Sequence, residues 1–305
     1  MDFTAFGEVL IDMISDDYEK CLADVKSFNK YFGGSPANIA VNLSKQGFKT
    51  RIISKTGNDF FGDFISSYLK NNGVNTDNII RSPENNTDIV FVLKSKDNPQ
   101  FYPYRSSTLN LEIPYNYEEL INNTKIFHFS FWSISSDKNL INTKKMISYA
   151  FSENKIIGFD PNYRKILSHN SDNIKDILKS FLKYTTLIKP SEDDCFHIFG
   201  EMSENSYIDI LHDMGAQNII MTLGKNGYIV SDGKKRIKYK SAATQVIDTT
   251  GAGDAFWTGT YIGLLNSENI FDSAFIGNIF AAEKLKSTGS VAEIENYKTL
   301  IKKYL

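Results

Sequence analysis

One stretch near the C-terminus constrains this chain more than any other: Asp248-Thr249-Thr250-Gly251-Ala252-Gly253-Asp254, followed at once by an apolar segment. Small residues let consecutive backbone N–H groups converge on an anion, and a helix that begins there adds the positive end of its dipole. A carboxylate at this place would repel a bound phosphate unless it accepts a proton. The stretch therefore predicts phosphoryl transfer to a hydroxyl, with Asp254 as general base and the N–H groups of Gly251, Ala252 and Gly253 stabilising the developing charge.

A second glycine-rich helix start, Gly33-Gly34-Ser35-Pro36-Ala37-Asn38, lies near the N-terminus. Taken alone, it is equally typical of a plain structural helix start. However, Gly33 and Gly34 leave backbone open to a small ligand, and the Asn38 amide can pair with vicinal hydroxyls. Asp12, at the end of a predicted strand over 3–11, is the natural partner of Asn38. A carboxylate, an amide and open backbone suit a polyol.

Apolar runs alternate with amphipathic segments along most of the chain. Strands are expected at 3–11, 49–56, 126–130, 156–160, 186–189 and 218–223, helices at 60–69, 140–151, 174–182, 207–214 and 271–282, and a hairpin at 227–230 and 236–239. This order predicts an α/β fold, a doubly wound and mostly parallel sheet with helices on both faces. Segments 13–32 and 88–105 alternate without a helix and predict a small β-sheet lid on a single domain spanning 1–305.

The charge balance excludes several classes of partner. Lys and Arg number 34 against 36 Asp and Glu, so no broad basic face is expected, and neither nucleic acid nor an anionic membrane is expected as a partner. The two cysteines, Cys21 and Cys195, lie in dissimilar contexts, which favours a reducing compartment over a disulfide framework. No apolar run reaches the roughly 18 residues of a membrane span, and the expected location is cytoplasmic.

Together, the two glycine-rich signatures resemble those of the ribokinase-like (pfkB-type) carbohydrate kinases, and the resemblance runs from Gly7 to about Gly289. It implies ATP and Mg²⁺ as cosubstrates, a small lid, and transfer to a sugar hydroxymethyl group. It also implies that Asp254 is the catalytic base and that Asp12, Gly34 and Asn38 bind the sugar. An exposed lid sheet would allow two lids to pair in a homodimer.

The resemblance further assigns a nucleotide side. Lys189-Pro190-Ser191-Glu192 falls where the family has Asn-x-x-Glu, whose Glu organises Mg²⁺ indirectly; Glu192 fits, whereas Lys189 replaces the Asn and is expected to approach the phosphates itself. Further candidates are Thr222, Gly224 and Gly227 in the nucleotide-side loop and Asn278 beside the adenine. Asp248 and Thr250 resemble part of a monovalent-cation (K⁺) site, whose later half would lie around 287–291.

The substrate is the open question. Asp160-Pro161-Asn162-Tyr163-Arg164 and Tyr104-Arg105 resemble segments shared by fructokinases and 2-keto-3-deoxygluconate kinases. Arg105 and Arg164 suit a neutral sugar, a phosphate or a carboxylate. We predict a fructokinase, with 2-keto-3-deoxygluconate kinase as the alternative enzyme and a non-catalytic sugar- or nucleotide-sensing protein as the alternative class. An oxidoreductase is disfavoured because no Gly-x-Gly-x-x-Gly follows the first strand.

Overall fold

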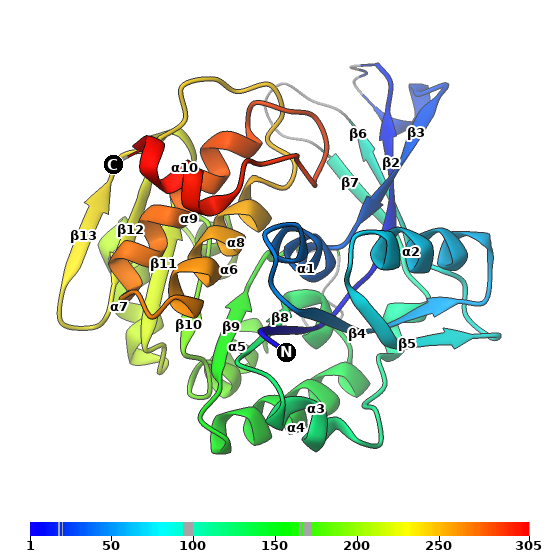
Figure 1. The fold of residues 1–305 in the computed structure, drawn as a ribbon, viewed down its shortest axis with the longest axis horizontal. Helices are drawn as coiled ribbons and strands as arrows, with labels where there is room; N and C mark the ends of the chain where they lie inside the picture. The colour runs from blue at the N-terminus through cyan, green and yellow to red at the C-terminus, as the bar shows by residue number, and fades with distance from the viewer. Residues whose placement is uncertain (18, 20, 94–99, 165, 167–172, 305) are drawn as a thin grey trace.

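The computed structural model describes residues 1–17, 19, 21–93, 100–164, 166 and 173–304, and within them the strands form two sheets (Figure 1). The large sheet runs in the order β13 (Arg236–Tyr239), β12 (Tyr228–Ser231), β11 (Asn218–Thr222), β10 (Leu187–Ile188), β9 (Ile156–Asp160), β8 (Ile126–Ser130), β1 (Phe3–Phe6), β4 (Thr50–Gly57) and β5 (Asn75–Ser82). From β11 to β5 all neighbours are parallel, and β12 and β13 add the predicted antiparallel hairpin at one edge. The predicted doubly wound sheet is confirmed.

Helices cover both faces of this sheet. One face carries α1 (Ser35–Lys45), α2 (Phe60–Asn71), α8 (Ala252–Leu265), α9 (Ile270–Lys284) and α10 (Tyr297–Tyr304), and the other carries α3 (Tyr117–Asn122), α4 (Asp137–Ser152), α5 (Ile174–Leu182), α6 (Glu192–Phe199) and α7 (Glu204–Asp213). Alternate residues of β1 reach opposite cores: Phe3 and Ala5 pack on one side and Phe6 on the other. Both faces are therefore buried, as a parallel sheet requires.

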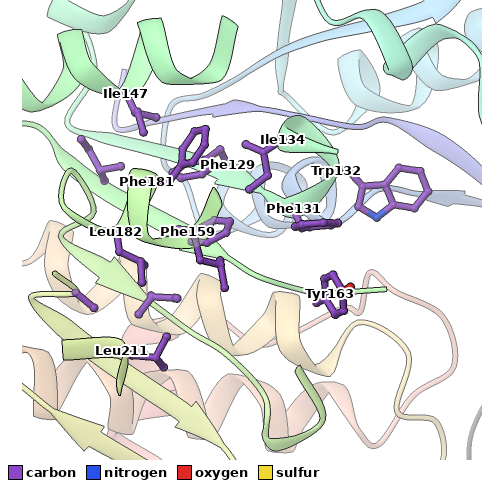
Figure 2. Packing of buried hydrophobic residues seen from close by; sticks show 14 of the residues in the cluster. Phe129, Phe131, Trp132, Ile134, Ile147, Phe159, Tyr163, Phe181, Leu182 and Leu211 are labelled. Atoms are coloured by element: carbon purple, nitrogen blue, oxygen red, sulfur yellow. The ribbon is translucent and has the colours of Figure 1, made fainter. Parts of the chain in front are cut away.

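An aromatic cluster fills the core on the α4 and α5 side (Figure 2). Phe129 of β8 and Phe159 of β9 stack with ring centroids 4.6 Å apart, and Phe181 of α5 lies 5.9 Å from Phe129. Further along, Phe131 meets Tyr163 edge to face at 5.1 Å. Because Tyr163 belongs to the loop after β9, this core also fixes the backbone at the carboxyl edge of the sheet.

A separate small sheet stands beside the large one, in the order β3 (Phe28–Gly33), β2 (Leu10–Ser15), β6 (Ile89–Leu93) and β7 (Gln100–Tyr104) (Figure 1). The lid was predicted over 13–32 and 88–105; β6 and β7 lie within the second segment, whereas β2 begins before the first segment, at Leu10, and β3 ends just after it, at Gly33. Residues 18, 20 and 94–99 of those segments lie outside the described residues. In the parts of the chain that the structure describes, no helix combines the length and the apolar character needed to cross a membrane.

The prediction of one strand over 3–11 is wrong. β1 ends at Phe6, and β2 begins at Leu10 in the other sheet. The chain turns between them at Gly7, where a Cβ would lie only 2.7 Å from Cγ of Pro36. Residues 3–11 are buried throughout, so their pattern contained no sign of the break. Asp12 consequently sits within the small sheet, and not at the end of a central strand.

Candidate active site

A cavity of about 920 Å³ lies between the carboxyl edge of the large sheet and the small sheet. The large sheet contributes Asp160 at the end of β9, Lys189 just after β10 and Thr222 at the end of β11. The small sheet contributes Asp12 from β2 and Phe101 from β7. In parallel α/β sheets this edge is where ligands bind. The two sheets therefore form opposite walls of one site.

Asp254 lies in this cavity, in the first turn of α8. Helices α1 and α8 pack side by side, which brings two α1 side chains onto its carboxylate (Figure 1). Ser35 Oγ donates to Oδ1 at 2.6 Å, and Asn38 Nδ2 donates to Oδ2 at 2.8 Å. Burial raises the pKa of Asp254 to about 6, although these two hydrogen bonds lower it. The group is thus mostly ionised at neutral pH and more basic than an ordinary aspartate.

The glycine-rich loop starts α8. Gly251 caps the helix at φ +76°, in the left-handed region, and a Cβ there would overlap the carbonyl oxygen of Ser290. Gly251 and Gly253 line the cavity. Ala252 does not line it, and its N–H donates to the carbonyl of Thr249 at 3.2 Å. The loop therefore presents glycine backbone and the positive end of a 14-residue helix to the cavity.

The second glycine pair accommodates Asp12 and the helix start. A Cβ on Gly33 would overlap the Asp12 carboxylate. Gly34 has φ +107°, and a Cβ added to it would lie 2.6 Å from the carbonyl oxygen of Glu8. Burial, followed by the charge of Asp254, raises the pKa of Asp12 to about 7. Gly34, Asn38 and Asp12 all line the cavity, whereas Gly33 serves to leave room for Asp12.

Lys189 is buried next to the glycine loop. A Cβ placed on Gly253 would lie 3.5 Å from Lys189 Nζ. The ammonium is 3.8 Å from Oδ2 of Asp160 and 5.4 Å from the ring centroid of Trp257, whose Nε1 donates to the same Asp160 oxygen at 2.9 Å. Burial raises the pKa of Asp160 and the charge of Lys189 opposes that rise. A fixed positive charge therefore adjoins the start of α8.

The loop from Asp160 to Arg164 is held by Asp194 of α6. One oxygen of Asp194 accepts the Tyr163 N–H at 2.7 Å, and the other accepts the N–H and hydroxyl of Ser191 at 2.8 and 2.7 Å. Arg164 lines the cavity with its side chain 41% exposed, 3.8 Å from Asp194, and it faces the ring of Phe101 at 5.5 Å. Glu192 is exposed in the first turn of α6 and does not line the cavity, but its neighbour Asp193 does.

The remaining nucleotide-side candidates are Thr222, Gly224, Gly227 and Asn278. Thr222 lines the cavity, and its N–H donates to Pro190 O at 3.0 Å. Gly224 and Gly227 bound the turn after β11; a Cβ on Gly227 would overlap Tyr239 O, so this glycine is also required for packing. Asn278 accepts from the Ala242 N–H at 3.0 Å and donates to Lys240 O at 3.2 Å. Its amide therefore fixes the loop after β13.

Arg105 lies behind the cavity wall. Its buried guanidinium donates to Ser135 Oγ at 2.6 Å and stacks over Trp132, whose side chain lines the cavity, at 4.5 Å. Its Nε is 3.9 Å from a carboxylate oxygen of the fully buried Asp88. Arg105 thus supports the wall and does not line the cavity.

The model of the pfkB family carbohydrate kinases matches residues 2–296. The chain belongs to this family. An ATP-dependent 6-phosphofructokinase of Thermoanaerobacterium thermosaccharolyticum is 36% identical over 99% of this chain and 94% of the relative. A 5-dehydro-2-deoxygluconokinase of Clostridium beijerinckii is 30% identical over 92% and 86%. The structure of Halothermothrix orenii fructokinase is 35% identical, with a TM-score of 0.81 over 91% of this chain and 96% of that one.

The kinase brings most of the predicted residues to one cavity. Those that line it are Asp12, Gly34, Asn38, Arg164, Lys189, Thr222, Thr250, Gly251, Gly253 and Asp254; those that do not are Gly33, Arg105, Glu192, Gly224, Gly227, Asp248, Ala252 and Asn278. Sequence reasoning missed Ser35, Glu8 and Asp194. Asp194 had a usable signal, because Ser191-x-x-Asp194 forms a capping box. Ser35 and Glu8 had none beyond their places beside the glycines.

Proposed function

We propose that this pfkB-family kinase is an ATP-dependent fructokinase that transfers the γ-phosphoryl group of ATP to a hydroxymethyl group of fructose, giving fructose 6-phosphate. The observation that carries the proposal is the position of Asp254. It is a buried carboxylate with a pKa of about 6, set between the start of α8 on one side and Asp12 and Asn38 on the other. It can therefore accept a hydroxyl proton from a polyol that lies against the small sheet.

The polyol site is formed by Asp12, Asn38 and the backbone at Gly34. Carboxylate and amide oxygens accept from sugar hydroxyls, and the Asn38 side-chain nitrogen, which now donates to Asp254, fixes the direction of that carboxylate. The small sheet lies over this site with Phe101 and Val90. We propose that it acts as a lid that excludes water, which would otherwise compete as the phosphoryl acceptor.

The phosphate site is formed by the start of α8 and by Lys189. In the proposed mechanism Asp254 takes the proton from the acceptor oxygen while the Gly251 and Gly253 backbone, the helix dipole and the Lys189 ammonium stabilise the charge on the transferring group. Lys189 stands beside Gly253, where a long side chain reaches the site directly. The family asparagine is thus replaced by a residue that carries a charge of its own.

The residues also fit a magnesium nucleotide. Among the described residues, no three His, Cys, Asp or Glu side chains group as a metal cage. Mg²⁺ binds with one or two carboxylates, substrate phosphates and several waters, so it needs no such cage. Asp193, which lines the cavity, would hold the hydrated ion, and Glu192 beside it would act on the ion only indirectly. When bound, the ion supplies charge neutralisation for the phosphates.

The charge of the sugar side favours a neutral acceptor. Asp12 and Asp254 both line it, and among the described residues the small sheet contributes no basic side chain to the cavity. An acceptor that carries a phosphate or carboxylate would meet these acids and depend on Arg164 alone at that end. Fructose avoids this repulsion. Fructose 6-phosphate is the second candidate, and the 36% identical phosphofructokinase is the observation that favours it.

A substrate panel tests the proposal. Purified protein with Mg²⁺ and ATP would be assayed with fructose, fructose 6-phosphate, 2-keto-3-deoxygluconate and 5-dehydro-2-deoxygluconate, and kcat/KM compared. We expect fructose to give the highest value. A higher value for fructose 6-phosphate or for a keto-deoxy acid would reject fructokinase within the family. No turnover with any acceptor across the panel would instead support a sensing protein on the same fold.

A further inference from the structure

A fully buried lysine lies directly behind the glycine-rich loop. Lys284, at the end of α9, has 0% exposure. Its Nζ donates to the carbonyl oxygens of Asp248 at 2.9 Å and Ser287 at 3.3 Å, and it lies 3.9 Å from Oδ2 of Asp248. The ammonium is therefore surrounded by oxygens from two separate stretches of chain. A buried charge of this kind is tolerated only when it is paired and hydrogen-bonded.

The same oxygens join the glycine loop to the turn after α9. The Asp248 carboxylate accepts the N–H of Thr250 at 2.9 Å and that of Gly289 at 2.8 Å. Ser290 follows at once: its carbonyl abuts Gly251, and its hydroxyl donates to Asn38 Oδ1 at 3.3 Å. Any change in the oxygen cluster around Lys284 is thus transmitted within a few residues to Gly251 and Asn38.

This cluster coincides with the monovalent-cation site that the sequence predicted at Asp248, Thr250 and 287–291. The structure brings Asp248 and the 287–289 turn together, but around the Lys284 ammonium. The ammonium carries the single positive charge of K⁺, offers three donors to oxygen and is tethered to a helix. The residues therefore do not fit a free K⁺ ion in addition to the lysine.

We propose that Lys284 is a built-in monovalent cation, a positioning residue that holds the Asp248–Asp254 loop in its phosphate-binding shape and makes the enzyme independent of added K⁺. The inference rests on the proposed function for the role of the loop, but not for the site itself. The charge of Lys284 acts through the Asp248 carboxylate and carbonyl on the loop backbone. It does not contact the substrate.

Two variants and a change of salt test this. Wild-type activity would be measured in chlorides of K⁺, NH₄⁺, Na⁺ and tetramethylammonium at equal ionic strength, and it should vary less than about 2-fold. Lys284→Ala, which leaves space for an ion, should lose at least about 10-fold in kcat in tetramethylammonium chloride and regain most of it in K⁺ or NH₄⁺. Lys284→Met, which fills the space without charge, should not be rescued. Lys286→Ala, in the partly buried pair with Glu283, is the matched control.

A melting assay gives a readout that does not depend on turnover. K⁺ or NH₄⁺ should raise the Tm of Lys284→Ala and leave that of the wild type and of Lys284→Met unchanged. Activation of the wild type several-fold by K⁺ would overturn the proposal. A folded Lys284→Ala protein whose Tm and activity do not change with the cation would also overturn it. If Lys284→Ala does not fold, the salt response of the wild type decides alone. Failure of the proposed kinase activity would leave the melting result standing and is therefore distinguishable.

Discussion

Ser35 Oγ lies 2.6 Å from Oδ1 of Asp254, so the first turn of α1 donates a hydrogen bond to the first turn of α8 across 219 residues of sequence. The bond favours the ionised carboxylate, whereas burial favours the protonated one, and the resulting pKa is about 6. The two opposing effects leave a base that is charged at neutral pH and still able to take a proton. Ser35 thus tunes the group that the proposed reaction depends on.

Replacing Ser35 should move the pH profile of the kinase. Ser35→Ala removes a bond that lowers the pKa of Asp254, so the acidic limb of log kcat/KM, expected near pH 6 in the wild type, should shift to higher pH. At pH values above this limb, kcat/KM should change little. Ser44→Ala, near the other end of α1, is the control and should keep the wild-type limb. An unchanged limb in Ser35→Ala would contradict the tuning role.

Replacing the proposed base, Asp254, should remove most of the turnover without abolishing binding. Asp254→Asn keeps the size of the side chain and removes its charge, so kcat should fall at least about 100-fold, the scale of a general base. ATP and fructose should still bind, because the α8 start, Lys189 and Asp12 are untouched. Rapid-quench assays measure kcat, and calorimetric titration measures the binding of ATP and of fructose. Activity within a few-fold of wild type would show that Asp254 is not the base.

The sequence predicted those features of the site and fold that local motifs determine, and it missed features that depend on the folded chain. Asp254 and Asn38 were predicted because glycine-rich helix starts restrict their neighbours to few roles, and Asp12 was predicted as a partner from its place at the end of an apolar run. All three line one cavity. The break at Gly7 was not predictable, since residues 3–11 are buried throughout and only the folded chain shows that β1 and β2 belong to different sheets. Strand β5 was missed because an edge strand with the sequence NTDNIIRS lacks a continuous apolar run.

Buried charges were the other limit. Lys284 continues a helix whose inward face is apolar, and a lysine at a helix end is ordinarily solvated, so its burial could not be foreseen. Arg105 was expected at the sugar, but it instead stacks behind Trp132 beside Asp88. In both cases the sequence supplied the charge, and only the packing of distant segments shows which oxygens surround it.

Lys189 should prove essential for the phosphate side. Lys189→Met removes the ammonium beside Gly253 with little change in side-chain length, and kcat/KM for ATP should fall about 100-fold or more, as on loss of one preorganised charge-stabilising group. The KM for fructose should change far less. Lys144→Met, at an exposed position on α4, is the control. A rise in the KM for fructose as large as the rise in the KM for ATP would indicate a general structural defect, as would a lowered Tm.

Arg164 should separate neutral from anionic acceptors. Its side chain is 41% exposed at the cavity, and Nη1 donates to Tyr163 O at 2.9 Å. With fructose, Arg164→Gln should change kcat/KM less than about 5-fold, whereas any turnover of fructose 6-phosphate should fall about 10- to 100-fold through loss of a charge-assisted bond. Arg236→Gln, on edge strand β13, is the control. A large loss of kcat/KM with fructose would indicate that Arg164 contacts the neutral sugar.

Glu8 should make the protein less stable as pH rises. It is 1% exposed, accepts from Ser130 Oγ at 2.6 Å, and burial raises its pKa to about 8 from an ordinary 4.5. Between these two values the folded state keeps a proton that the unfolded state has lost, so the free energy of unfolding decreases with pH and levels off above 8. Glu8→Gln resembles the protonated acid and should lack this decrease.

Urea unfolding at pH 5 and pH 8.5 tests this. The free energy of unfolding of the wild type and of Glu8→Gln should be similar at pH 5, and the variant should be more stable by about 2 to 4 kcal/mol at pH 8.5. Glu153→Gln, at an exposed position, should follow the wild type. Parallel pH dependence of Glu8→Gln and wild type would show that Glu8 is already ionised in the folded protein.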